Sequence, residues 1–254
     1  YEGLKAAFPD AQIINADQIM TDLRVIKSEA ELSCLREGLR IAEEIFPEVL
    51  ENLKPGMTEL QAVGMVNALM YEKGAECESL PSYVFAGKST THAISRPTHN
   101  VLQKGDMIQL NYGARIDGYS PCIGRPVCLG KMTDRQRELV EFGKEAHYKT
   151  VEWIKAGEIA ANVAKKYIQF FKDKGYESNY LYGPCHGLGM IEVEKPWMET
   201  ISEYPLAENM TFQVDTFLYE RGSFGLRWEN GMRVTKDGCE LMSNKHMDIY
   251  ELEV

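Results

Sequence analysis

The sequence predicts an α+β fold built of two similar halves, each pairing helices with an antiparallel sheet. Two observations carry this prediction. Segments with the 3.6-residue period of amphipathic helices are followed by segments with a period of two, and this order occurs twice along the chain. With 254 residues, the chain is long enough to bury a full core.

The first predicted helix begins where Ser28 and Glu31 form a capping box, and it ends at the KPG sequence of residues 54–56. Pro47 lies inside this helix, so we expect it to kink the helix or split it in two. The other predicted helices span residues 58–74, 133–156 and 159–175.

Strands are predicted where the period changes to two, at residues 107–112, 125–129, 210–219, 224–229 and 231–235. Alternation places polar side chains on one face of three of them, namely Gln109 with Asn111, Gln213 with Asp215, and Arg227 with Glu229. Exposure of one face to solvent would explain this pattern. Phe217, Tyr219 and Trp228 on the same strands favour cover on both faces instead, and a covered polar face is expected to form a pocket.

Composition excludes several classes of function. A net charge of −10 and the absence of a basic patch argue against a nucleic-acid partner. No apolar run approaches the roughly 18 residues that a membrane span needs. The six cysteines form no CxxC pair, which favours reduced thiols, and the first residues lack the features of a secretory signal. We therefore expect a cytoplasmic protein with no membrane partner.

Three histidines stand in distinctive surroundings. His186 lies between glycines in GPCHGLGM, where the backbone can pass close to a ligand or a neighbouring strand. His92 and His99 lie in STTHAISRPTHN, which is either an exposed turn or a loop for substrate binding and proton transfer. A single histidine is more often a hydrogen-bonded structural residue than a ligand.

Taken in order, six segments resemble the creatinase/aminopeptidase P family, which is the M24 or pita-bread family: RVIKSEAEL, LKPGMTE, QKGDMIQLNYGARIDGY, GPCHGLG, ENMTFQVD and GLRWENGMRVTKDG. The resemblance implies a pita-bread catalytic-type domain, an α+β fold, over residues 23–254. Residues 1–22 resemble a linker or the tail of a missing N-terminal domain. The resemblance also implies a homodimer.

Peptidases of this family hold two metal ions with two aspartates, a histidine and two glutamates. Carried over by position, these ligands fall on Asn111, Cys122, His186, Asp215 and Glu229. Only His186 and Glu229 match outright, and we expect His186, Asp215 and Glu229 to converge on one pocket. A second family histidine falls on Val193, just before Glu194. The histidine that shuttles protons falls on Ile94, so His92 and His99 are both out of register.

Asn111 and Cys122 stand where the family has two aspartates, so the site lacks negative charge that two metal ions require. Two divalent ions about 4 Å apart repel by roughly 17 kcal/mol at an effective dielectric near 20. The resemblance therefore implies no metal or one divalent ion, Zn or Mn, held by Cys122, His186, Asp215 and Glu229. Creatinase works on this fold without metal, although one of its catalytic glutamates falls on Gly124 here.

The function expected from this resemblance is hydrolysis of a C–N bond in a small peptide or amino-acid derivative, such as a dipeptide-like substrate. Glu229 and Asp215 would act as anionic anchor or base, and His186 or His92 as acid. The substrate contacts would come from Asn111, Arg125, Arg227, His99 and Glu194. The two arginines would either hold a substrate carboxylate or pair with Asp215 and Glu229. The alternative is a catalytically inactive pita-bread scaffold that binds a peptide or protein.

Overall fold

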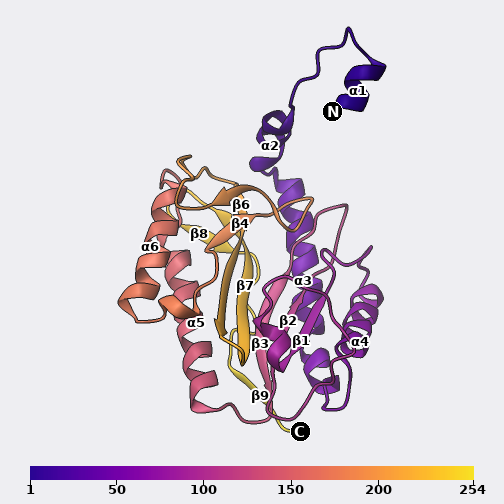
Figure 1. Cartoon of the computed structure of the whole chain (residues 1–254), viewed down its shortest axis with the longest axis vertical. Coiled ribbons are helices and arrows are strands. Elements are labelled where there is room, and N and C mark those ends of the chain that lie inside the picture. Colours follow the sequence, from indigo (N-terminus) through magenta and orange to yellow (C-terminus); the bar gives the residue numbers. More distant parts are fainter.

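The computed structural model describes all 254 residues and consists of one curved sheet with helices packed around it (Figure 1). The sheet order is β1-β2-β3-β7-β6-β4-β5, with β8 beside β7 and β9 beside β3. Every pairing is antiparallel except that of β3 with β9. Helices α3 and α4 accompany the first half of the sheet, and α5 and α6 the second half. The pita-bread α+β fold is therefore confirmed.

The helices are α1 (Glu2–Ala7), α2 (Asp17–Val25), α3 (Glu29–Asn52), α4 (Glu59–Glu72), α5 (Asp134–Trp153) and α6 (Ala160–Asp173), with short 3-10 helices at Gly87–Thr91 and Glu177–Asn179. The strands are β1 (Tyr83–Ala86), β2 (Met107–Tyr112), β3 (Ile123–Leu129), β4 (Cys185–Gly187), β5 (Glu194–Met198), β6 (Thr211–Glu220), β7 (Phe224–Val234), β8 (Cys239–Leu241) and β9 (Tyr250–Leu252). No helix is both long enough and apolar enough to cross a membrane.

Capping boxes begin three of the helices, at Ser28, Thr58 and Thr133. Each cap satisfies backbone N–H groups that have no partner within the helix. Helix α3 continues through Pro47, so of the two expected outcomes, a kink or a split, the split does not occur. Phe46 and Val49, on either side of the proline, are fully buried in the core beneath α3 and α4, and this packing holds both parts of the helix in place.

The predicted strands 224–229 and 231–235 form one continuous strand, β7. Glycine at 231 lets this strand pass close beneath α3. A side chain there would meet Leu39 of α3, with 2.9 Å between the added Cβ and the leucine Cδ1. The polar faces of β2, β6 and β7 are covered, as expected from the aromatic residues on the same strands. Asn111, Asp215 and Glu229 are each at most 3% exposed.

The two halves of the sheet meet where β3 pairs with β7, in register at Gly124 and Glu229. Arg125 reinforces this seam from the opposite face of the sheet. Its guanidinium donates to the carbonyls of Gly124 (2.8 Å), Glu229 (2.7 Å) and Lys245 (3.0 Å). Arg125 is fully buried, so these three carbonyls have a charged donor that water cannot replace.

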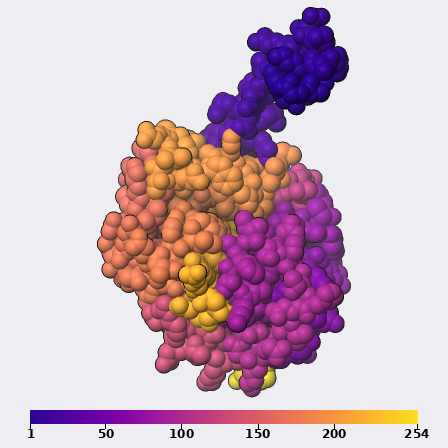
Figure 2. Space-filling model, viewed as in Figure 1, coloured from indigo at the N-terminus to yellow at the C-terminus, as the bar shows by residue number.

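Residues 1–22 extend away from the body of the molecule, as the indigo segment shows (Figures 1 and 2). Neither α1 nor α2 contains a buried residue. Helix α2 is attached by ion pairs to β5, where Arg24 pairs with Glu194 and Asp17 pairs with Lys195. Lys27, which follows α2, also pairs with Glu194, at 3.1 Å.

Replacing Arg125 with methionine (Arg125→Met) should lower the free energy of unfolding by about 3 kcal/mol, because three buried carbonyls lose their donor at the seam. Urea denaturation checks this. Arg137→Met, which removes a partly exposed arginine of α5, is the control and should change stability little. Equal effects of the two substitutions would show that the seam does not depend on Arg125.

Candidate functional site

A cavity of about 650 Å³ opens beside β4, β6 and β7. Five of its charged residues gather at the base of the cavity, namely His186, Glu192, Asp215, Arg227 and Glu229, and Glu199 also lines it. Its walls are mainly apolar and aromatic, with side chains that include Tyr83, Ile94, Tyr182, Val193, Trp197 and Ile201. Such a combination of apolar walls and a few convergent polar groups is typical of a small-molecule site.

Strand register brings the base together. Asp215 of β6 lies opposite Glu229 of β7, and Glu229 lies opposite Gly124 of β3, which in turn pairs with Asn111 of β2. A side chain at position 124 would put its Cβ 2.7 Å from the Cβ of Glu229 and 3.0 Å from the Cγ of Arg227. Glycine at 124 therefore leaves the space that the stem of Arg227 and the side chain of Glu229 occupy.

The expected convergence of His186, Asp215 and Glu229 is confirmed, since their ligand atoms lie within 4.8 Å of one another. His186 contributes from β4, the short strand that pairs with β6. Its Nε2 lies 3.6 Å from an oxygen of Glu229. Its other ring nitrogen, Nδ1, lies 3.1 Å from the carbonyl of Gly187, which fixes the orientation of the ring.

Arg227 lies between the two strand carboxylates and shares its charge between them. Its Nε is 3.2 Å from Oδ1 of Asp215, and its Nη1 is 3.8 Å from Oε2 of Glu229. The Asp215 contact is an ion pair without hydrogen-bond alignment, because Nε and Oδ1 satisfy the distance but not the angle. Nη2 donates to the hydroxyl of Tyr182 and to the carbonyl of Ala93. All the guanidinium nitrogens are thus engaged by the protein.

Asn111, at the position of a family metal ligand, turns the N–H group of its amide toward Glu229. Its Nδ2 donates to Oε2 of Glu229 (2.6 Å) and to the carbonyl of Ile123 (3.2 Å), while its Oδ1 accepts from Nη1 of Arg227 (3.3 Å). These opposite partners fix the orientation of the amide. The oxygen of Asn111 faces a cation that is already present, and the nitrogen faces the carboxylate.

Cys122 lies just before β3 and is fully buried. Burial, together with the nearby carboxylates of Glu229 and Glu192, raises the pKa of this thiol well above its ordinary value. The side chain of Gln213 donates to its sulfur (2.9 Å), and the thiol lies 3.3 Å from Oε1 of Glu192. Cys122 is therefore a neutral thiol in this environment.

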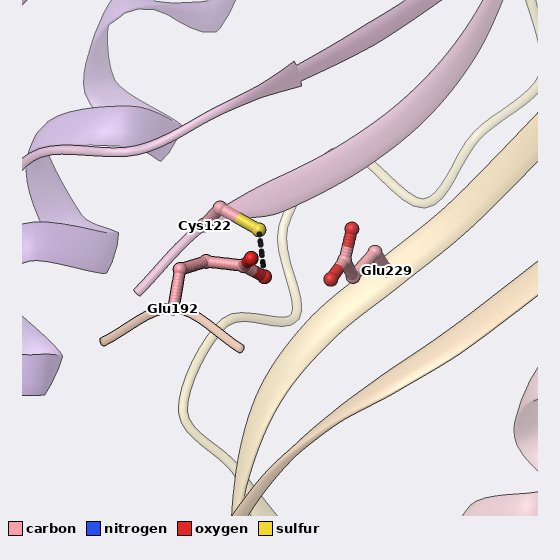
Figure 3. Close-up of side chains that lie close together, drawn as sticks. All are labelled: Cys122, Glu192 and Glu229. Atoms are coloured by element: carbon pink, nitrogen blue, oxygen red, sulfur yellow. Dashed lines mark hydrogen bonds between the residues drawn. The ribbon is translucent and has the colours of Figure 1, made fainter. Parts of the chain in front are cut away.

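Glu192 is a site residue that the sequence did not reveal. It lies in the connection between β4 and β5, and Figure 3 shows its carboxylate beside the Cys122 sulfur and facing Glu229. Its Oε1 is also 3.6 Å from Nε2 of His186. The family pattern drew attention to Glu194 instead, two residues later. Glu192 lies in a bend before β5 begins at Glu194, so strand alternation does not place its side chain.

Several predicted site residues lie outside the cavity lining. His92 and His99 are exposed, Glu194 is engaged by Lys27 and Arg24, and Arg125 lies on the opposite face of the sheet. Asn111 and Cys122 are beneath the base, in contact with Glu229 and Glu192. The structure thus brings together His186, Asp215, Glu229, Arg227, Asn111 and Cys122, but not His92, His99, Glu194 or Arg125.

Mutual interaction separates the pKa values of the acidic groups. Burial alone would lower the pKa of His186, but the charges of Glu192, Glu229 and Asp215 raise it to about 9. Burial raises the pKa of Asp215 to about 6 and that of Glu192 to about 8, despite the nearby cations. The pKa of Glu229 is lowered, because contacts with His186 and Arg227 outweigh its burial. Acids with such different pKa values suit different roles in proton transfer.

The fold and site define a hydrolase-type domain of the pita-bread class. The family model of metallopeptidase family M24 matches residues 33–236, and the chain therefore belongs to that family.

Individual relatives agree with this assignment. The Xaa-Pro dipeptidase of Lactobacillus delbrueckii subsp. lactis is 28% identical over 256 residues, which cover 100% of this chain and 70% of that protein. The crystal structure of the X-Pro aminopeptidase from Thermotoga maritima MSB8 matches with a TM-score of 0.93 and 26% identity, over 98% of this chain and 70% of that one. The Xaa-Pro dipeptidase from Bacillus anthracis matches with a TM-score of 0.92 and 27% identity, with the same coverage.

The residues of this chain do not fit the pair of metal ions implied by the family resemblance. The guanidinium of Arg227 lies between Asp215 and Glu229, Asn111 presents an N–H group to Glu229, and Cys122 is a neutral thiol. A pair of divalent cations would need bridging anions at these positions. For a single ion, one group of donors is Cys122, Glu192 and Glu229, whose ligand atoms lie within 4.8 Å of one another.

Replacing Arg227 with methionine (Arg227→Met) should destabilise the protein by about 3–5 kcal/mol near neutral pH, because two buried carboxylates lose their cation. The pKa of Asp215 is already above its ordinary value in the folded state and should rise further. The folded state then binds more protons than the unfolded state, so stability falls as pH rises. The deficit relative to the unmodified protein should therefore be larger at pH 8 than at pH 5.

Urea denaturation at the two pH values measures this difference. Arg233→Met is the matched control on the same strand, since Arg233 pairs with the more exposed Glu29 and Glu240. It should have a smaller effect that varies little between pH 5 and pH 8. A deficit for Arg227→Met that is the same at both pH values would contradict the ion-pair account.

Proposed function

We propose that this chain hydrolyses a C–N bond in a small peptide or amino-acid derivative, with at most one metal ion, and that Arg227 supplies the positive charge that metal ions would otherwise supply between Asp215 and Glu229. The observation that carries the proposal is the position of the Arg227 guanidinium, at 3.2 Å and 3.8 Å from these two carboxylates at the base of the cavity. Membership of family M24 supports hydrolysis, and the relatives named Xaa-Pro dipeptidase support a dipeptide-like substrate.

In this mechanism, His186 is the general acid and Asp215 the general base. Asp215 has a pKa of about 6, which is close to neutral and suits a base that must accept a proton from water. The water oxygen bonds to the substrate carbon, its proton passes to Asp215, the C–N bond breaks, and His186 protonates the leaving nitrogen. Glu229 keeps His186 protonated, and Arg227 with Tyr182 holds Asp215 in place.

The alternative remains a catalytically inactive scaffold that binds a peptide or protein. Exposed apolar side chains at the cavity favour this alternative, because Ile94 and Ile201 are 77% and 79% exposed. Contiguous exposed apolar groups often mark binding surfaces. The proposal also includes residues 1–22 as a linker or domain tail, the homodimer implied by the family resemblance, and a degenerate metal site.

Elemental analysis of the purified protein should find no more than one equivalent of divalent metal per chain, because the base lacks the anions that would bridge two ions. The same protein should release little proline from a panel of Xaa-Pro dipeptides. Two equivalents of Mn, Co or Zn together with efficient proline release would contradict the proposal.

His186→Gln and Asp215→Asn should each lower kcat by about 10²–10⁴-fold on any compound that the unmodified protein turns over in a panel of dipeptides, dipeptide amides and N-acyl amino acids. His99→Gln removes an exposed histidine outside the cavity and should leave kcat unchanged. Turnover that survives both substitutions would contradict the assigned roles. An unmodified protein that hydrolyses no member of the panel would favour the scaffold.

A further inference from the structure

Acidic residues outnumber basic ones in the cavity, and the basic ones are already engaged. Among its lining residues, the acids are Glu192, Glu199, Asp215 and Glu229, whereas the bases are His186 and Arg227. The guanidinium of Arg227 is occupied by Asp215, Asn111, Tyr182 and Ala93. No lining cation is therefore free to meet a carboxylate on a ligand. Arg96, whose charge acts on Tyr83 of the cavity wall, is exposed and does not line the cavity.

At the base itself, three carboxylates face two cations. Asp215 and Glu229 share Arg227, and His186 lies between Glu192 and Glu229, with 3.6 Å from its Nε2 to an oxygen of each. With all five groups ionised, the base would carry one net negative charge, whereas the pKa of about 8 for Glu192 keeps that carboxyl largely protonated near pH 7 until a cation joins it. A buried net charge is unfavourable, so one further positive charge would bring the base to neutrality.

Glu192 holds the carboxylate oxygen that is left over. For Asp215, Tyr182 donates to one oxygen and the Arg227 Nε lies 3.2 Å from the other; for Glu229, Asn111 donates to one oxygen and the His186 Nε2 lies 3.6 Å from the other. Glu192 uses Oε1 with Cys122 and His186, but its Oε2 accepts no hydrogen bond from the protein. The residue is only 6% exposed and lines the cavity. This oxygen is not enclosed by the protein, so it is open to the cavity and can meet a ligand there.

The walls define the rest of the ligand. Tyr83, Tyr182 and Trp197 present aromatic rings, and Leu80, Val193 and Ile201 present aliphatic groups. Position 193 is the one where the family resemblance expects a histidine, and valine there adds apolar surface in place of a polar group. An apolar body of a ligand would gain from burial on this surface at about 25 cal/mol per Å².

We propose that the cavity selects a ligand with one cationic nitrogen seated against Glu192 and an apolar body against the aromatic and aliphatic walls, and that it rejects the same body carrying a carboxylate. This inference builds on the proposed function by naming the charge class of its substrate: an amine or amide-capped peptide with a free amino group, rather than a peptide that is recognised through its free carboxylate.

Three probes with the same phenylpropyl body isolate the charge. They are 3-phenylpropylamine, 3-phenylpropanol and 3-phenylpropionate, and none contains a C–N bond that this chemistry hydrolyses. Dissociation constants are measured at pH 7 by ligand-observed NMR on protein freed of metal by dialysis against a chelator. We expect the amine to bind at least about tenfold more tightly than the alcohol, and the carboxylate to bind most weakly.

Substitution of Glu192 tests the assigned partner. Glu192→Gln should reduce the advantage of the amine over the alcohol to about twofold or less, with the affinity for the alcohol unchanged. Glu192→Asp keeps the charge and should keep the preference. Glu203→Gln removes an exposed acid outside the cavity lining and should change neither value. Circular dichroism and the unchanged alcohol affinity show that a variant is folded.

A carboxylate probe that binds as tightly as the amine, or a Glu192→Gln protein that still prefers the amine, would overturn the inference. Because the probes are not substrates, this outcome is independent of whether the protein hydrolyses anything. Failure of the hydrolase proposal appears instead in the turnover panel, so the two failures can be told apart.

Discussion

The ion pair that joins Arg227 to Asp215 and Glu229 is the interaction on which the site depends. Two carboxylates face each other across adjacent strands, almost completely buried at the base of the cavity. Without a cation, each would cost several kcal/mol through desolvation and mutual repulsion. Arg227 lies two residues before Glu229 on the same strand, and Asp215 pairs with Glu229 across the strands, so alternation and register together place all three side chains on one face. Gly124 on the neighbouring strand leaves the room that this arrangement needs.

Glu229 connects this network to the stability of the whole sheet. Its side chain contacts Arg227, Asn111 and His186 on the cavity face, while its backbone carbonyl accepts from Arg125 on the other face. The residue therefore stands at the seam between the two halves and at the centre of the charge network. The electrostatics of the site and the joining of the halves are linked through one position of β7.

Much of the site could be predicted from the sequence because it lies on long strands. Alternation placed Asp215, Arg227 and Glu229 on polar faces, and the order of motifs predicted the fold. Alternation also predicts that Arg125, which adjoins Gly124, faces the side of the sheet opposite to the cavity. Glu192 could not be found this way. It lies between two short strands whose register shifts at His186 and Gly187, so no period extends far enough to place it.

The account can be tested directly where the two carboxylates and the guanidinium meet. Crystals of the protein soaked in Mn²⁺, with anomalous diffraction data collected near the manganese edge, would show what lies between Asp215 and Glu229. We predict no anomalous peak between these two carboxylates and clear density for the Arg227 guanidinium in contact with both. Two manganese peaks at this position, with the Arg227 side chain displaced from the carboxylates, would contradict the account.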